Sequence, residues 1–202
     1  MSTTERRERA RQELRQAILA AALELAREGG WGAVTIRQLA QRVEYSPPAI
    51  YEYFASKEAI LNGLIEEGFA RLHQGLVDSA TAEQPRERIL QAADAHWEFA
   101  MENPALYRAM YGLDGMPFRA GESLAAEGEI FAFLREAVAR HRQEPVVVSA
   151  QPTGLDGDVE ILLATVHGLI ATALAGRTVG GPERVHRLLK RAVRTLLDQW
   201  GA

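Results

Sequence analysis

The chain has 202 residues, of which 47% are hydrophobic, and it contains no cysteine. It is therefore long enough to form a hydrophobic core, and disulfides, thiolate metal sites and cysteine redox sensing are excluded. The net charge is −4, but residues 1–57 carry nine basic and seven acidic side chains, whereas residues 58–202 carry fourteen and twenty. This weak asymmetry has the sign expected of an N-terminal segment that binds a polyanion.

The first ten residues alternate arginine and glutamate and are expected to fray in solution. Two interpretations stay open: a solvated tail, or an arm whose Arg6, Arg7 and Arg9 approach phosphate or the minor groove of a nucleic acid. The segment is too charged for a secretory signal, and the longest apolar stretch, 161–176, is shorter than the roughly 20 residues of a membrane span. A cytoplasmic protein is therefore expected. An amphipathic helix is predicted from Leu14 to the glycine pair at 29–30.

Two short helices are predicted between residues 35 and 54 from their capping residues. Thr35 is expected to accept from the amide of Gln38, whose side chain completes a capping box. Ser46 is expected to cap the second helix by accepting from the amide of Ala49, with Pro47 at the first helical position. Only a short turn remains between the two helices.

The second helix of this pair has a buried face and an exposed face. Ile50 and Phe54 are four residues apart and are expected to point inward, which leaves Pro47, Pro48 and Tyr51 exposed. A helix, a tight turn and a second helix with an exposed polar-aromatic face form the helix-turn-helix arrangement, in which the second helix enters the DNA major groove.

The pattern from Thr35 to Lys57 resembles the tetracycline-repressor (TetR) family of bacterial transcriptional regulators. The resembling residues are Thr35, Ile36, Leu39, Ala40, Ser46, Ala49, Ile50, Tyr51, Tyr53, Phe54 and the run Ser56-Lys57-Glu58-Ala59-x-Leu61. The chain departs from the family pattern at Glu44, where glycine is usual. The resemblance implies DNA contacts from the following positions: Thr35, Arg37, Ser46, Pro47, Pro48, Ala49, Tyr51, Tyr53 and Lys57.

The remaining elements are all predicted to be helices. Ser56 is expected to cap a long helix, and further helices are expected at about 86–102, 104–111, 124–142, 158–175 and 182–200, with loops at 112–121 and 143–157. We therefore predict an all-α protein with a three-helix DNA-binding head (residues 1–56) and a regulatory, dimerising body (residues 57–202).

The helix predicted at 158–175 is apolar nearly all round, which indicates burial on two sides. One face carries bulky residues, and the opposite stripe is small. We expect the small stripe, with part of the last helix, to pack on a second subunit; the alternative is that both faces are internal to one large domain. The predicted dimer interface consists of Ala164, Gly168, Ala171, Thr172, Leu189, Val193 and Leu196.

Aromatic and sulfur-containing residues gather between positions 97 and 133. Each of them could be an ordinary core residue, but as a set they are similar to the effector pocket that the resemblance implies between the middle helices. Such pockets are largely apolar with a few polar groups. The predicted ligand-binding residues are His96, Trp97, Met101, Tyr107, Met110, Tyr111, Phe131, Leu134 and His167.

No catalytic set, metal-ligand spacing or cofactor motif occurs in the sequence, so we expect no enzyme activity, no metal and no cofactor. The resemblance implies a homodimeric, ligand-responsive repressor that a hydrophobic small molecule releases from a palindromic double-stranded operator. Two alternatives stay open: an all-α small-molecule carrier or enzyme with a vestigial head, and a nucleoid-type DNA-binding protein without an effector.

Overall fold

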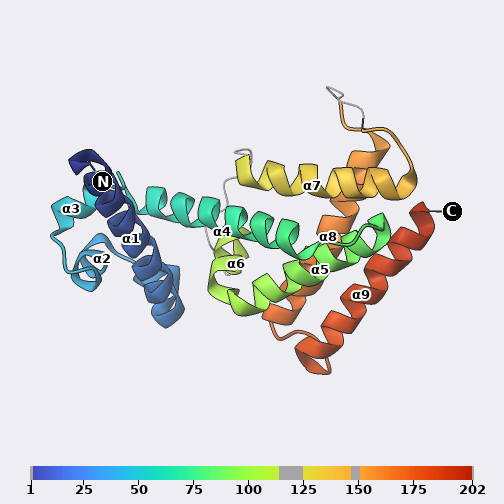
Figure 1. Cartoon of the computed structure of the whole chain (residues 1–202). Helices are drawn as coiled ribbons and strands as arrows, with labels where there is room; N and C mark the ends of the chain where they lie inside the picture. The colour runs from blue at the N-terminus through green and yellow to red at the C-terminus, as the bar shows by residue number, and fades with distance from the viewer. Residues whose placement is uncertain (1, 114–124, 147–150, 202) are drawn as a thin grey trace. The chain divides into compact units, whose positions relative to one another are not determined.

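The structure, a computed structural model, describes residues 2–113, 125–146 and 151–201. These residues form helices joined by turns and loops, without a strand, which confirms the all-α prediction (Figure 1). The predicted loops at 112–121 and 143–157 lie partly outside the described residues. The helices are α1 (Thr3–Ala33), α2 (Ile36–Arg42), α3 (Pro47–Tyr51), α4 (Lys57–Ser79), α5 (Pro85–Glu102), α6 (Pro104–Met110), α7 (Ala125–Arg142), α8 (Gly154–Leu174) and α9 (Gly181–Trp200).

The chain divides into two compact units. The head unit comprises residues 1–68 and 105–118, and the body unit comprises residues 69–104 and 119–202. The boundary falls inside α4, between Gly68 and Phe69, so that α4 contributes its first turns to the head unit and its remainder to the body unit.

The core of the head unit forms where α1 packs with α2, α3 and the start of α4. Ile18 of α1, Leu39 of α2, Ile50 of α3 and Ile60 of α4 are each fully buried. Helix α6 also belongs to this unit and approaches α4 closely at Gly68, where an added Cβ would lie only 2.6 Å from the sulfur of Met110. A side chain at position 68 would therefore require the Met110 side chain to move.

Helix α1 begins at Thr3, eleven residues before the predicted start at Leu14. The amide of Glu5 donates to the hydroxyl of Ser2 (3.1 Å), and the amide of Ser2 donates to the carboxylate of Glu5 (2.8 Å). This reciprocal capping box satisfies two otherwise unpaired donors and orders the first turn. At its other end, α1 continues past the expected stop through a kink at Gly30 (φ 73°) to Ala33.

The caps of the helix-turn-helix segment differ in part from those predicted. The amide of Gln38 donates to the hydroxyl of Thr35 (3.2 Å) as expected, but that hydroxyl donates to the amide oxygen of Gln38 (2.9 Å). The amide of Ala49 donates to the backbone carbonyl of Ser46 (3.0 Å), and the Ser46 side chain makes no capping bond. The predicted side-chain cap at Ser46 was therefore wrong, because the first turn of α3 is satisfied by its own backbone.

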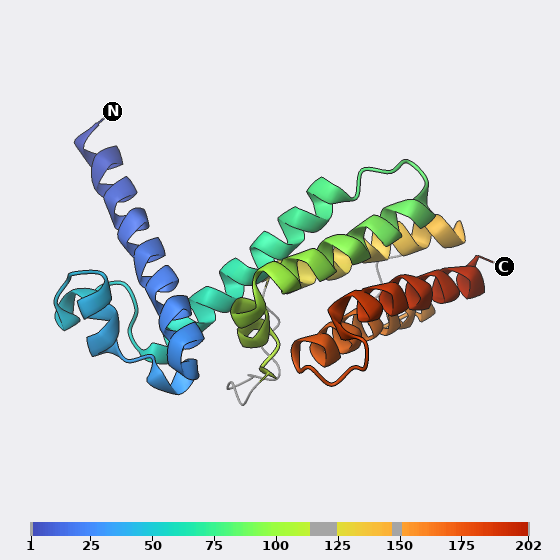
Figure 2. The same ribbon diagram turned by 90° about the horizontal axis from the view of Figure 1, so that it is seen from below.

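The body unit is built from the end of α4 with α5, α7, α8 and α9. Figure 2 shows α8 and α9 running beside each other, and α5, α7 and α9 also pack together. Its core includes Ile89, Val138, Val159 and Val193, each at most 1% exposed. Helix α8 begins at Gly154, four residues before the predicted start, because Thr153 forms a capping box with an aspartate three residues later.

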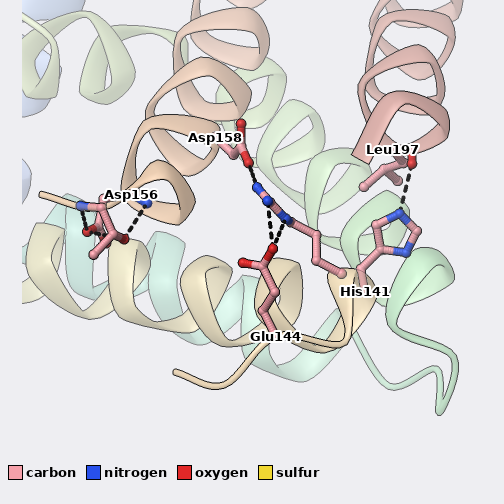
Figure 3. A network of polar contacts seen from close by, with 7 residues as sticks. His141, Glu144, Asp156, Asp158 and Leu197 are labelled. Carbon is pink, nitrogen blue, oxygen red and sulfur yellow. Dashed lines mark hydrogen bonds and ion pairs between the residues drawn. The ribbon is translucent and has the colours of Figure 1, made fainter. Parts of the chain in front are cut away.

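Polar contacts join the end of α7 to the start of α8 and to the end of α9 (Figure 3). Nε of Arg135 lies 2.6 Å from a carboxylate oxygen of Asp156, and Arg142 pairs with both Asp158 and Glu144. The ring N–H of His141 donates to the carbonyl of Leu197 (2.8 Å). These contacts fix the three helix ends within the body unit.

Candidate DNA-binding and effector sites

Helix α3 presents an exposed face next to a buried one, as the sequence predicted. Ile50 is fully buried, whereas the side chain of Tyr51 is 55% exposed. Pro47 and Pro48, in the first turn, are also exposed, and Ala49 is half-buried. The exposed face is thus mainly apolar and aromatic, which suits contact with thymine methyl groups better than paired hydrogen bonds to guanine.

Groups that can donate hydrogen bonds precede and follow α3 in the sequence. Thr35, Arg37 and Ser46 are exposed, and Tyr53 is half-buried just after α3. Tyr45, in the turn before α3, is 51% exposed and was not among the predicted contacts. Its position directly before the predicted cap Ser46 was the only signal in the sequence.

The turn between α2 and α3 passes through a left-handed residue. Glu44 has a φ of 59°, and the amide of Tyr45 donates to the carbonyl of Ala40 (2.9 Å), which closes the end of α2. This conformation is unfavourable for a residue with a Cβ, which explains why the family pattern carries glycine here.

Lys57, predicted to contact phosphate, is held by the head unit itself. Its Nζ donates to the backbone carbonyl of Trp31 (2.7 Å) and lies 5.3 Å from the centroid of the Trp31 ring. The side chain is half-buried. Because an ammonium group has three donors, this bond orients Lys57 and leaves donors for a further acceptor.

The body unit contains a small cavity close to some of the predicted ligand-binding residues. Its volume is about 10 Å³, the space of a single water molecule. Residues from α4, α5, α7 and α8 line it: Leu76, Ile89, Ala92, Ala93, His96, Leu134, Leu162, Leu163 and Val166. His96 and Leu134 were predicted from the sequence, and the aliphatic remainder was missed because it follows ordinary helical core spacing.

His96 is the only polar residue of this lining and is 3% exposed. Burial, with a smaller effect from the charge of His167, lowers the pKa of His96 to about 3. Burial also lowers the pKa of His167, which is half-buried on α8. Both imidazoles are therefore neutral at pH 7, and the cavity lining carries no charge.

The other predicted ligand-binding residues lie elsewhere. The ring of Trp97 stacks on His186 of α9 (centroids 4.9 Å apart, planes 3° apart), and His186 lies 2.9 Å from a carboxylate oxygen of Asp94. Met101 and Phe131 are half-buried in the body unit and do not line the cavity.

Three predicted residues, Tyr107, Met110 and Tyr111, belong to the head unit. Tyr107 is fully buried, its ring lies 4.6 Å from that of Tyr111, and burial together with Tyr111 raises its pKa. The predicted set is thus divided between the two units, and the cavity contains only part of it.

Helix α8 exposes the small stripe that the sequence predicted. Ala164, Gly168 and Thr172 are exposed, and Ala171 is half-buried. Ile161, on the same surface, is 50% exposed. These residues leave an apolar helix face open on the single chain.

The predicted contribution of α9 to a subunit interface needs correction. Leu189 and Val193 are fully buried inside the body unit, so their side chains are not available to a second chain. They point toward the core because the apolar stripe of α9 packs on its own protomer. Leu196 is half-buried and stays a candidate.

Among the described residues, α8 is the one helix long and apolar enough to cross a membrane by length and composition. Its bulky residues Leu162, Val166 and Ile170 are buried in the body unit, so one face of α8 packs on its own protomer. Within the same described ranges, no group of three or more His, Asp or Glu side chains is placed to hold a metal ion.

Comparison with known proteins gives two family matches. Residues 18–64 match the model of bacterial regulatory proteins of the tetR family, and residues 89–196 match that of a tetracyclin repressor-like C-terminal domain. An HTH-type transcriptional regulator of Bacillus subtilis (strain 168), YobS, is 32% identical over 92 residues, 46% of this chain and 48% of YobS. The class D tetracycline repressor protein of Escherichia coli is 32% identical over 92 residues, 46% of this chain and 36% of that protein.

The chain thus spans about half the length, or less, of the curated relatives it matches. A structure of a protein from Rhodococcus sp. RHA1 matches with a TM-score of 0.77 and 25% identity, over 94% of this chain and 96% of that one. The TetR regulator PfmR of Thermus thermophilus shares the fold, with a TM-score of 0.64, 22% identity and coverage of 90% and 97%. With family matches to both the helix-turn-helix segment and the helical body, the chain belongs to the TetR family of transcriptional regulators.

Proposed function

We propose that this regulator is a homodimeric repressor, located in the cytoplasm, which a hydrophobic small molecule releases from a palindromic operator. The observation that carries the proposal is the arrangement of α3. Ile50 is buried and fixes the helix on the head, while Pro47, Pro48 and Tyr51 are exposed. A short helix held in this way can enter the major groove with its N-terminal turn first.

In this proposal the exposed groups of the head have two roles. Tyr51, Pro47 and Pro48 contact base edges, chiefly thymine methyl groups, and so determine the sequence preference. Thr35, Arg37, Ser46, Tyr53 and Lys57 donate to phosphates, which fixes the register on the duplex without reading bases.

The proposed dimer uses the open face of α8. Small residues at 164, 168 and 172 allow a second helix to approach closely, and burial of Ile161 would remove an exposed apolar side chain from water. A two-fold axis through this face would pair two heads on one palindromic site.

The proposed effector binds the body near His96. The lining around His96 is aliphatic and uncharged, which favours a hydrophobic ligand with a single polar group. Such a ligand releases DNA only to the extent that it binds one form of the protein better than the other, typically by about 1–3 kcal/mol.

The test begins with selection of preferred duplexes from a random pool by the full-length protein. We expect a palindromic preference, and Tyr51→Ala should weaken binding to the selected duplex by about 1–3 kcal/mol and blur the preference. Tyr51→Phe keeps the aromatic ring and should therefore retain the sequence preference. Selection of no common sequence would contradict the proposal.

The dimer is tested by sedimentation of Ala164→Arg, which places a charge on the open face of α8. This variant should be monomeric and should lose binding to the selected duplex, while Ala20→Arg, the same change at an exposed position of α1, should stay dimeric.

The effector is tested by titrating apolar metabolites into the protein with and without the selected duplex, which measures whether a ligand releases the protein from DNA. A ligand that binds tightly without any change in DNA affinity would indicate a carrier.

A further inference from the structure

The first turns of α1 form an ordered, solvent-exposed helix whose arginines are unevenly distributed. Residues 4–13 are all exposed, and the capping box at Ser2 holds the helix from its first turn. In Figure 2 these turns project from the head beyond α2 and α3. Because these turns cover no core, burial does not account for their distribution of charge.

One side of this segment is a basic stripe. Arg7, Arg11 and Arg15 are spaced by four residues and therefore lie along one helix face. The positions three and four residues from Arg7 and from Arg15 hold no carboxylate, and Glu8 is the one acidic neighbour of Arg11. The charges of this stripe are thus largely uncompensated within the helix.

The other face of the segment is balanced as a whole, because it holds Arg6 and Arg9 together with Glu5 and Glu13. Arg9 lies four residues from both Glu5 and Glu13, which is the spacing of stabilising ion pairs on a helix. Arg6 shares the Arg9 face. The segment therefore has two faces with equal numbers of exposed arginines and different local charge, and this gives a natural control.

The basic stripe is placed next to the helix-turn-helix segment. The guanidinium of Arg15 lies over the ring of Phe54, 5.2 Å from its centroid, three residues after the end of α3. From Arg15 toward the N-terminus the stripe extends for two turns, and each four residues rise about 6 Å. Successive phosphates of one DNA strand lie about 3.4 Å apart along the axis, so the spacing between neighbouring arginines corresponds to about two phosphate steps. Ile18, which is buried, lies on the same face of α1 as the stripe. The stripe is therefore the exposed continuation of the face by which α1 packs in the head unit.

We propose that the Arg7–Arg11 part of α1 binds phosphates of the DNA duplex outside the groove that α3 enters. This inference rests on the proposed DNA-binding function. Arginine suits the task because its guanidinium makes paired hydrogen bonds to phosphate. The contact is independent of sequence, so it adds affinity and salt dependence without altering the base preference.

The test compares Arg7→Ala/Arg11→Ala with the control Arg6→Ala/Arg9→Ala in the full-length protein. Both remove two positive charges from exposed positions of one helix, and alanine preserves helix propensity. Binding is measured to a random-sequence duplex and to the selected duplex between about 50 and 200 mM salt. Circular dichroism checks that the helix content of the two variants is equal.

We expect the Arg7/Arg11 variant to bind both duplexes more weakly, by about tenfold or more at 0.1 M salt, with a salt slope lower by about two. The control should stay within about threefold of the wild type. Equal binding by the two variants, whether both weakened or both unchanged, would overturn the inference and leave the proposed function standing. A wild-type protein that binds neither duplex would overturn the proposed function itself.

Discussion

Lys57 is anchored on Trp31 in the head unit and, in the proposed function, also donates to a DNA phosphate, so its removal should affect both the stability of the protein and its DNA binding. The change to test is Lys57→Ala. It deletes a 2.7 Å hydrogen bond from Nζ to the carbonyl of Trp31 and a cation–π contact at 5.3 Å from the ring centroid. A hydrogen bond from a charged group contributes about 1.5–3 kcal/mol, and an accessible cation–π contact about 0.5–1 kcal/mol. Because the side chain is half-buried, we expect a loss of about 2 kcal/mol.

Two assays separate the two roles of Lys57. Urea unfolding followed by circular dichroism measures the loss of stability, and the salt dependence of binding to a random-sequence duplex measures the phosphate contact. We expect a slope lower by about one. The control, Arg27→Ala, removes one exposed charge from α1 and should leave stability unchanged.

A double-mutant cycle with Trp31→Leu isolates the part of the Lys57 effect that depends on the ring. An unchanged free energy of unfolding in Lys57→Ala would refute the anchoring role. An unchanged salt slope would refute the phosphate contact.

Two further predictions concern a strained turn and a buried imidazole. Glu44→Gly should raise the free energy of unfolding by about 0.5–1 kcal/mol, because glycine adopts the φ of 59° without a Cβ clash. The control Glu44→Ala should give no gain in stability. Equal urea midpoints for the two variants would contradict this prediction. His96, with its pKa lowered to about 3, stays neutral in the folded chain while the unfolded chain takes up a proton below pH 6.5. The free energy of unfolding should therefore fall by about 2 kcal/mol between pH 6.5 and pH 5. In urea titrations, His96→Gln should make the free energy of unfolding depend less on pH. Parallel pH profiles for the variant and the wild type would show that His96 is not the cause.

The helix-turn-helix segment was predictable because its signals are local. Thr35, Pro47 and the four-residue spacing of Ile50 and Phe54 each act within one or two turns, so the sequence determined the buried and exposed faces of α3. Tyr45 was missed because no periodic pattern distinguishes an exposed aromatic residue in a turn from one that folds back on the core.

The errors concern partners that lie far apart in the sequence or caps that were overlooked. The apolar stripe of α9 predicted burial, but periodicity cannot tell whether the covering surface belongs to the same chain or to another, and so Leu189 and Val193 were assigned to the wrong surface. The start of α8 and the start of α1 were missed for a different reason. Both helices start at a capping box, at Thr153 for α8 and at Ser2 for α1. The segments that follow these caps were predicted to be irregular, because the first contains glycines and the second is highly charged.

The size of the cavity at His96 bears on how the proposed regulator would respond to its effector. A volume of about 10 Å³ holds no organic ligand. An effector that binds there must therefore select or create a form in which α4, α5, α7 and α8 have separated, and its apparent affinity is reduced by the rarity of that form. A pocket already open in the DNA-binding form could be filled without any effect on DNA. A ligand that needs this separation binds the separated form better than the closed one, and it changes DNA binding if the separated form also binds DNA differently.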